Sequence, residues 1–126
     1  MTNAELALLA LDRINATGVP DPSLYAEDFV FVTRGELAGR TKYHGYDGLL
    51  RVMKEVSESW KAMRGESLAF EELGENGLLL SIRWHVTSHS GVELDVDEAW
   101  VCRFRDGLFV RIEQYDNREE ALAAQD

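Results

Sequence analysis

VELDVDEAWVCRFRDGLFVRIEQY, residues 92–115, is the stretch that decides the fold of this 126-residue chain. Apolar and polar residues alternate along most of it, which is typical of β-strands that bury one face. The Asp106-Gly107 pair interrupts the alternation and indicates a tight turn. We therefore predict two antiparallel strands, over residues 92–105 and 108–115.

Two registers are open for this hairpin. In a two-residue turn at Asp106-Gly107, Arg105 pairs with Leu108, whereas in a three-residue loop Phe104 pairs with Leu108. We favour the loop because it collects the apolar residues on one face of the sheet. That face then carries Val92, Leu94, Val96, Trp100, Cys102, Phe104, Leu108, Val110 and Ile112, with Glu98 beside Gln114. The outer face carries Ala99, Val101, Phe109, Arg111, Glu113 and Tyr115, and the two-residue turn would instead bring the last three inward.

The segments on either side extend this pattern to an α+β domain. Residues 67–73 and 77–88 predict two further strands, which make an antiparallel meander with the last two. Upstream we expect a helix over 4–17 with a Thr2–Glu5 capping box, a short turn at Asp21-Pro22, and a strand over 29–33. A loop over 35–45 with a short strand, a helix from Asp47 to Gly65 and a helix over 117–124 complete the prediction.

This element order predicts one domain over residues 1–126, in which long helices cover one face of a curved antiparallel sheet. A funnel between the two layers is a natural small-molecule pocket. The net charge of −10 argues against nucleic acid and anionic membranes as partners. No signal peptide, membrane span, phosphate-binding loop, dinucleotide fingerprint or metal motif is evident, so we expect a cytoplasmic protein without a cofactor.

Glu98 is the one charged residue in the apolar set, between Val96 and Trp100. A carboxyl group among such neighbours must be hydrogen-bonded or neutral, because burying an isolated charge costs several kcal/mol or more. Such a group is suited to general acid or base catalysis. The alternative is a structural carboxylate near the mouth of the funnel. Gln114, on the same face, is a candidate to orient Glu98 or to bind a substrate oxygen.

The remaining candidates are mostly aromatic. A flat ligand would be lined by Tyr25, Phe31, Trp60, Trp84 and Trp100, although core packing explains the same residues. His44 precedes a helix and is a candidate for the funnel rim. His85 and His89 fall on the polar face with Arg83, and Asp95 and Asp97 are expected to pair with arginines such as Arg83. We predict that Cys102 is buried and inert.

Four segments carry a resemblance to a known family: Tyr43–Leu49 (YHGYDGL), Ser90-Gly91, Arg105–Arg111 (RDGLFVR) and Tyr115–Leu122 (YDNREEAL). In this order and spacing the chain resembles the SnoaL-like group of the cone-shaped NTF2-like superfamily. The resemblance implies a pocket for a small apolar carbonyl or polyketide-like compound, and cofactor-independent isomerisation or cyclisation with Glu98 as acid or base. It also implies a homodimer through the outer sheet face. The alternative is a non-catalytic ligand-binding or dimerisation module of the same fold.

Overall fold

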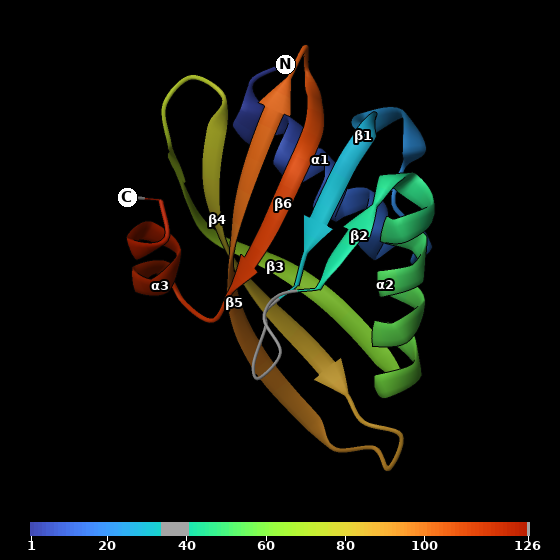
Figure 1. Ribbon diagram of the computed structural model, residues 1–126. Helices are drawn as coiled ribbons and strands as arrows, with labels where there is room; N and C mark the ends of the chain where they lie inside the picture. Colours follow the sequence, from blue (N-terminus) through green and yellow to red (C-terminus); the bar gives the residue numbers. More distant parts are fainter. Residues whose placement is uncertain (34–40, 126) are drawn as a thin grey trace.

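A single curved sheet with helices on both faces forms the domain (Figure 1). The computed structural model describes residues 1–33 and 41–125. In chain order the elements are α1 (Asn3–Thr17), the 3₁₀ turn η1 (Pro22–Leu24), β1 (Tyr25–Val32), β2 (Lys42–His44), α2 (Gly45–Ser59), β3 (Ala62–Glu72), β4 (Gly77–Thr87), β5 (Glu93–Arg105), β6 (Leu108–Tyr115) and α3 (Arg118–Ala123). The strand order is β2-β1-β6-β5-β4-β3. The predicted α+β class and the meander over β3–β6 are confirmed.

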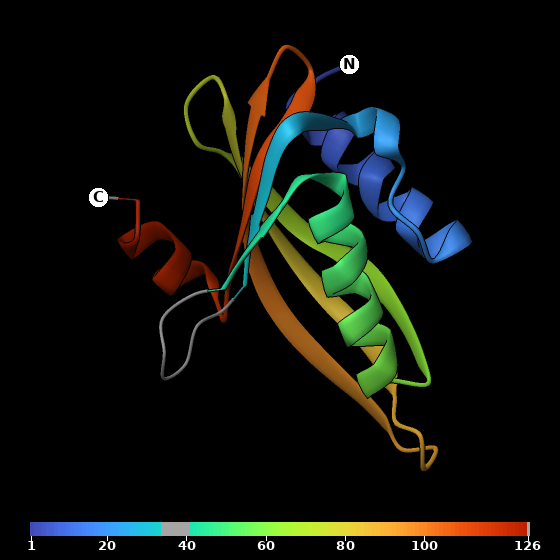
Figure 2. The same cartoon turned by 45° about the vertical axis from the view of Figure 1, so that its right-hand side comes forward.

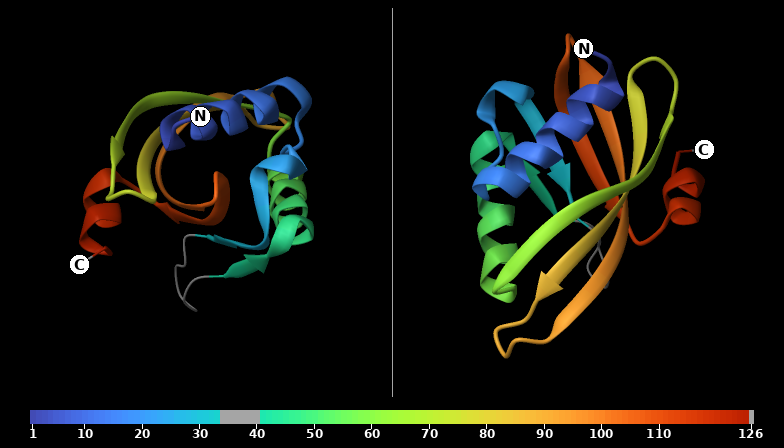
Figure 3. Two further views of the ribbon diagram at one scale, coloured as in Figure 1. Left: turned by 90° about the horizontal axis from the view of Figure 1, so that it is seen from above. Right: turned by 180° about the vertical axis from the view of Figure 1, so that it is seen from behind.

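The two long helices lie on the concave face of the sheet, and α3 lies on the other face (Figure 2). Seen from above, the sheet curls toward the side on which these two helices lie (Figure 3). Helix α1 contacts β3 and β4, whereas α2 contacts β1 and β2. The strands are antiparallel except for β1 and β6, which pair in parallel. The two long helices therefore cover opposite edges of the concave face, α1 over β3 and β4 and α2 over β1 and β2.

Local signals near the N-terminus act as the sequence predicts. The Thr2 side chain accepts from the Glu5 backbone N–H and Glu5 reaches back to the Thr2 backbone, so the capping box is present. Gly18 ends α1 in the left-handed region, with φ 75°. Asp21 caps η1 and Pro22 begins it. The short strand expected within residues 35–45 is β2, whereas residues 34–40 lie outside the described residues.

The last hairpin has the turn that we did not favour. Arg105 pairs with Leu108, and both Asp106 and Gly107 have positive φ, 54° and 76°, as a two-residue type I′ turn requires. The register then shifts between Arg103 and Phe104, which makes Val110 an extra residue on β6. Beyond this bulge Trp100 pairs with Gln114. The predicted faces are therefore right for Trp100 and Gln114, although the predicted loop is wrong.

The bulge also corrects the position of Phe109. We expected this side chain on the outer face, but it is buried in the main core with Phe104 and stacks on Tyr25. Phe109 precedes the extra residue, so its orientation follows the two-residue turn. Ile112 follows the extra residue and also faces inward. One inserted residue thus lets both apolar side chains reach the same core.

The second long helix is shorter than predicted. It ends at Ser59, and Trp60 already has extended backbone with φ −130° and ψ 139°. The Lys61 N–H then donates to the Thr87 carbonyl, because β3 begins to pair with β4 at once. Met63, which we placed on the helix, projects from β3, and Gly65 does not end the helix. Apolar residues still occur past the end of the helix because Trp60 and Met63 line the same cavity as the apolar residues of α2.

Two apolar residues of the predicted inner face are exposed. Val92 and Leu94 are 54% and 48% exposed. The hairpin of β4 and β5 extends beyond the end of α2, so nothing in the described chain covers its tip (Figure 1). Alternation predicts which face a residue occupies, but it does not predict how far the helices reach.

The outer face is partly covered by the chain itself. Helix α3 packs on a small second core that contains Leu79, Ala99, Val101, Tyr115 and Ala121. Elsewhere the face is charged, and Arg83 forms the expected ion pair with Asp97 at 2.8 Å. Of the apolar residues that we assigned to the outer face, Ala99 and Val101 thus lie in the small core with α3 and Phe109 lies in the main core, and the homodimer stays a prediction. Among the described helices, none has the length and hydropathy that a membrane crossing needs.

Candidate functional site

A cavity of about 210 Å³ lies between the concave face of the sheet and α2. Its walls are almost entirely apolar and come from both long helices and from five strands. It is lined by Ile14, Tyr25, Phe31, Leu49, Val52, Met53, Val56, Trp60, Met63, Trp84, Val86, Val96, Glu98, Trp100, Ile112 and Gln114. The volume exceeds the roughly 150 Å³ of an apolar cavity that holds benzene, so there is room for a compound of one or two rings.

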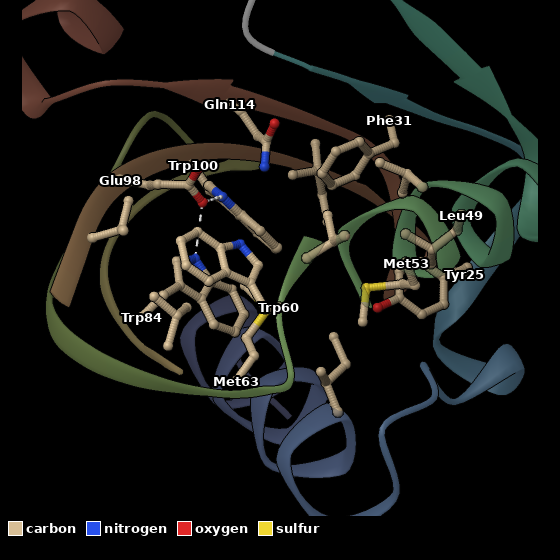
Figure 4. A pocket seen from close by; sticks show the side chains of 16 residues that line it. Tyr25, Phe31, Leu49, Met53, Trp60, Met63, Trp84, Glu98, Trp100 and Gln114 are labelled. Carbon is tan, nitrogen blue, oxygen red and sulfur yellow. Dashed lines mark hydrogen bonds between the residues drawn. The ribbon is translucent and has the colours of Figure 1, made fainter. Parts of the chain in front are cut away.

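Among the described residues of this lining, Glu98 is the only acidic one, and it is only 9% exposed. Its Oε1 accepts hydrogen bonds from the indole N–H of Trp84 at 2.8 Å and of Trp100 at 3.1 Å (Figure 4). An indole N–H can only donate, so Oε1 must be an acceptor in both bonds. Any proton that the carboxyl group carries is therefore on Oε2.

The strand register brings these three side chains together. Glu98 pairs with Ile82, and Trp84 with Val96, so Trp84 and Glu98 are diagonal neighbours on β4 and β5. Trp100 follows Glu98 by two positions and shares its face. The two indole rings pack together, with centroids 5.9 Å apart. Fixed aromatic neighbours hold the carboxyl group in one position, as a preorganised site requires.

Gln114 and Tyr25 add two further polar groups to the lining. Gln114 pairs with Trp100 across β5 and β6, and its amide has no hydrogen-bond partner among the described residues. The Tyr25 hydroxyl also has none there, although this residue is only 8% exposed. Burial raises the pKa of Tyr25, so its hydroxyl stays protonated and can donate. Figure 4 shows Glu98 and Gln114 on one side of the cavity and Tyr25 on the other.

Most of the predicted site residues are in one place. Tyr25, Phe31, Trp60, Trp84, Trp100, Glu98 and Gln114 all line the cavity. His44 does not, and its predicted place at the pocket rim is wrong. It is exposed at the end of β2, directly before α2 begins at Gly45, and does not belong to the lining. His44 pairs with Val30, whereas Tyr43 pairs with the lining residue Phe31, so His44 lies on the opposite face of the sheet from Phe31.

Other lining residues were not predicted as part of the site. Leu49, Val52, Met53 and Val56 lie on α2, and their spacing predicts one apolar stripe of a helix without indicating a pocket. These four side chains line the cavity, which the side chains of the sheet do not fill. A helix stripe carries the same signal in either case. Only the distance between the layers separates a core from a pocket.

The remaining ionisable residues lie outside the cavity. Cys102 is buried, and burial raises the pKa of its thiol to about 12, as an inert thiol requires. His85 lies on the outer face between Glu66 and Asp95, at 2.9 and 2.8 Å. His89 is bonded to the Glu58 carbonyl. Within residues 1–33 and 41–125, no three His, Cys, Asp or Glu side chains are grouped so that they could hold a metal ion.

Solved structures with the same fold cover nearly the whole chain. TerC, co-crystallised with polyporic acid, superposes with a TM-score of 0.77 at 21% identity, over 97% of this chain and 95% of that one. An NTF2-like protein of unknown function from Burkholderia pseudomallei K96243 gives 0.76 at 19% identity, over 98% and 97%. A proposed SnoaL-like polyketide cyclase from Jannaschia sp. CCS1 gives 0.74 at 13% identity, over 98% and 88%.

At these identities the structural matches establish the fold and nothing finer. No curated protein matches the sequence significantly. The SnoaL-like domain family, however, matches residues 10–112, which include the second half of α1, all of α2, the strands from β1 to β5 and all but one of the cavity residues. The chain therefore belongs to the SnoaL-like domain family, whose NTF2-like fold the structural neighbours share.

Proposed function

We propose that this protein binds a small, largely apolar carbonyl compound in the cavity and moves a proton on it, with Glu98 as the acid–base group. The observation that carries the proposal is a buried carboxyl group, bonded to two indoles, in the wall of an open apolar cavity. Among the similar structures is a proposed SnoaL-like polyketide cyclase, and this likeness supports the proposal. The apolar walls favour the neutral part of such a ligand.

The reaction begins with removal of a proton from the carbon next to the carbonyl group. The C–H bond breaks, the proton goes to Oε2 of Glu98, and the electron pair moves into the carbonyl group to form an enolate. Return of the proton at another carbon gives an isomer. If the enolate attacks a second carbonyl carbon instead, a ring forms and the new alkoxide takes the proton from Glu98.

Gln114 is placed to stabilise the negative oxygen. Its amide N–H group lies on the same side of the cavity as Glu98 and is not engaged with the described protein residues. In an apolar site, a hydrogen-bond donor directed at an oxygen that becomes negative stabilises the transition state more than the same donor does in water. Removal of one such donor typically lowers the rate by about 10²–10³-fold. No metal or dissociable cofactor is needed for this sequence of steps.

The experiment is exchange of the α-protons of 2-tetralone, a two-ring ketone, in deuterated water. We expect the protein to accelerate deuterium incorporation, followed by ¹H NMR, above the rate in buffer. Glu98→Gln keeps an oxygen that accepts from both indoles but removes the base, so the enzymatic exchange should fall by about 10²-fold or more. Unchanged exchange in Glu98→Gln would contradict the catalytic proposal.

Glu113→Gln is the matched control. Glu113 is on β6 next to Gln114 but is absent from the cavity lining, and it lies 3.5 Å from Arg111. Exchange by this variant should equal that of the wild type. If the wild type binds 2-tetralone but does not accelerate exchange of its protons, the protein is a ligand-binding module. That result would reject catalysis and keep the pocket.

A further inference from the structure

The polar groups of the cavity lie at two ends, with Tyr25 at one end and Glu98 and Gln114 at the other. This separation limits where a ligand can carry its polar atoms. Tyr25 pairs with Phe109 near the start of β6, whereas Gln114 lies five positions later on the same strand. At the rise of a β-strand their backbones are roughly 15 Å apart. Their side chains approach the cavity from opposite ends, as Figure 4 shows. Between them the wall is formed by aliphatic, aromatic and thioether groups.

The Tyr25 end is deep and lacks a protein partner for its hydroxyl. The ring is held by Phe29, with an edge contact at 5.0 Å, and by Phe109, stacked at 5.2 Å. Among the described residues no fully buried side-chain N or O atom lacks a partner, so the Tyr25 hydroxyl must have accessible surface, and Tyr25 lines the cavity. A second, smaller cavity of about 20 Å³ also touches Tyr25, together with Cys102 and Phe109. The hydroxyl is therefore positioned for an acceptor that arrives from outside the protein.

We propose that the ligand is a flat compound of one or two rings with oxygen at both ends: an enolisable carbonyl group beside Glu98 and Gln114, and a second oxygen that accepts from the Tyr25 hydroxyl. This inference rests on the proposed function, because it assumes that the carbonyl end reacts at Glu98. It goes beyond it by assigning Tyr25 to recognition of a distant substituent. Tyr25 is then a specificity residue and takes no part in proton transfer.

The test compares two ligands that differ in one group. The probes are 6-hydroxy-2-tetralone and 6-methyl-2-tetralone, which have the same shape, and affinity is measured by quenching of the tryptophan fluorescence. All three tryptophans of the chain line the cavity, so bound ligand should affect this signal. We expect the hydroxy compound to bind the wild type about 3- to 10-fold more tightly, the range of one neutral hydrogen bond.

Tyr25→Phe should abolish this preference and leave the affinity for the methyl compound within about 2-fold. The ring remains to pack on Phe29 and Phe109, so the variant should fold, which circular dichroism checks. Tyr43→Phe is the matched control, since that hydroxyl bonds Glu55 outside the cavity and should leave the preference intact. Equal affinities in the wild type, or a preference that survives Tyr25→Phe, would overturn the proposal.

Proton exchange separates this inference from the function on which it rests. If both compounds bind equally while Glu98-dependent exchange is seen, the role of Tyr25 is wrong and the catalytic proposal stands. If the Tyr25-dependent preference is found without exchange, the ligand class stands and catalysis at Glu98 is wrong. If neither compound binds the wild type, both proposals fail.

Discussion

Trp84 donates to Glu98 across two strands, with Nε1 and Oε1 2.8 Å apart, although the two residues are not directly opposite in the register. The bond is diagonal and crosses the concave face where the sheet lines the cavity. Trp100 donates to the same oxygen from the same strand as Glu98. The carboxyl group is thus held by tryptophans from both β4 and β5, so its position depends on both strands.

Replacement of Trp84 should therefore cost more than replacement of Trp100. Trp84 is buried and its bond is shorter, whereas Trp100 is half-buried. We expect Trp84→Phe to lower the free energy of unfolding by about 1–3 kcal/mol, the cost of removing one donor from a buried hydrogen bond. Trp100→Phe should lose less. Urea unfolding of the two variants measures this order, and an equal or reversed order would contradict the assigned roles.

Gly65 should not tolerate a side chain. A Cβ at this position would lie 2.7 Å from Leu11 Cδ1 and 2.7 Å from Trp84 Cζ3, where α1 crosses β3. Gly65→Ala should destabilise the protein by about 1–3 kcal/mol, because the core is already close-packed there. It should also shift Trp84 and weaken ligand binding. Thermal unfolding tests this, with Ser67→Ala on the same strand as a control that should change little.

His85 should stabilise the fold more in acid than in base. Its hydrogen bonds to Glu66 and then to Asp95 raise the pKa of the imidazole above its ordinary value. A raised pKa means that the contribution is fully present below the unfolded value near pH 6.5 and is lost as the pH rises through the folded value. The stability difference between wild type and His85→Gln should therefore be larger at pH 5.5 than at pH 9. A difference that does not depend on pH would contradict this.

Cys102 should resist thiol reagents while the protein is folded. It is 1% exposed and burial raises the pKa of the thiol to about 12, so little thiolate exists near pH 8. Labelling with a disulfide reagent should be limited by unfolding and should accelerate greatly in denaturant. Fast labelling of the native protein would contradict this prediction.

Much of the architecture could be predicted because local chemistry specifies it. Thr2, Glu5 and Gly18 mark both ends of α1, and Asn117 marks the start of α3. Alternation along β4 and β5 identified the concave face and the one carboxyl group on it. These signals involve neighbours in sequence, or the period of a strand, and tertiary packing did not override them.

Other features depend on contacts that a sequence pattern does not contain. The bulge at Val110 lets Phe109 and Ile112 face the same core, and nothing in their spacing indicates the extra residue. The early end of α2 follows from pairing of Lys61 with Thr87, far away in sequence. The face on which His44 lies follows from its pairing with Val30. The site residues were therefore predicted best on the regular strands. They were predicted worst near the ends of the helices.

The most direct measurement of the central claim is the ¹H–¹⁵N spectrum of the three tryptophan indoles during titration with 2-tetralone. The indole N–H groups of Trp84 and Trp100 both donate to the carboxyl group of Glu98, which we propose contacts the ligand. We predict that these two signals shift together and saturate with one ligand per chain, while the backbone amides of the Arg83–Asp97 pair on the outer face stay in place. Indole signals that do not move at saturating 2-tetralone, or shifts confined to the outer face, would contradict the account.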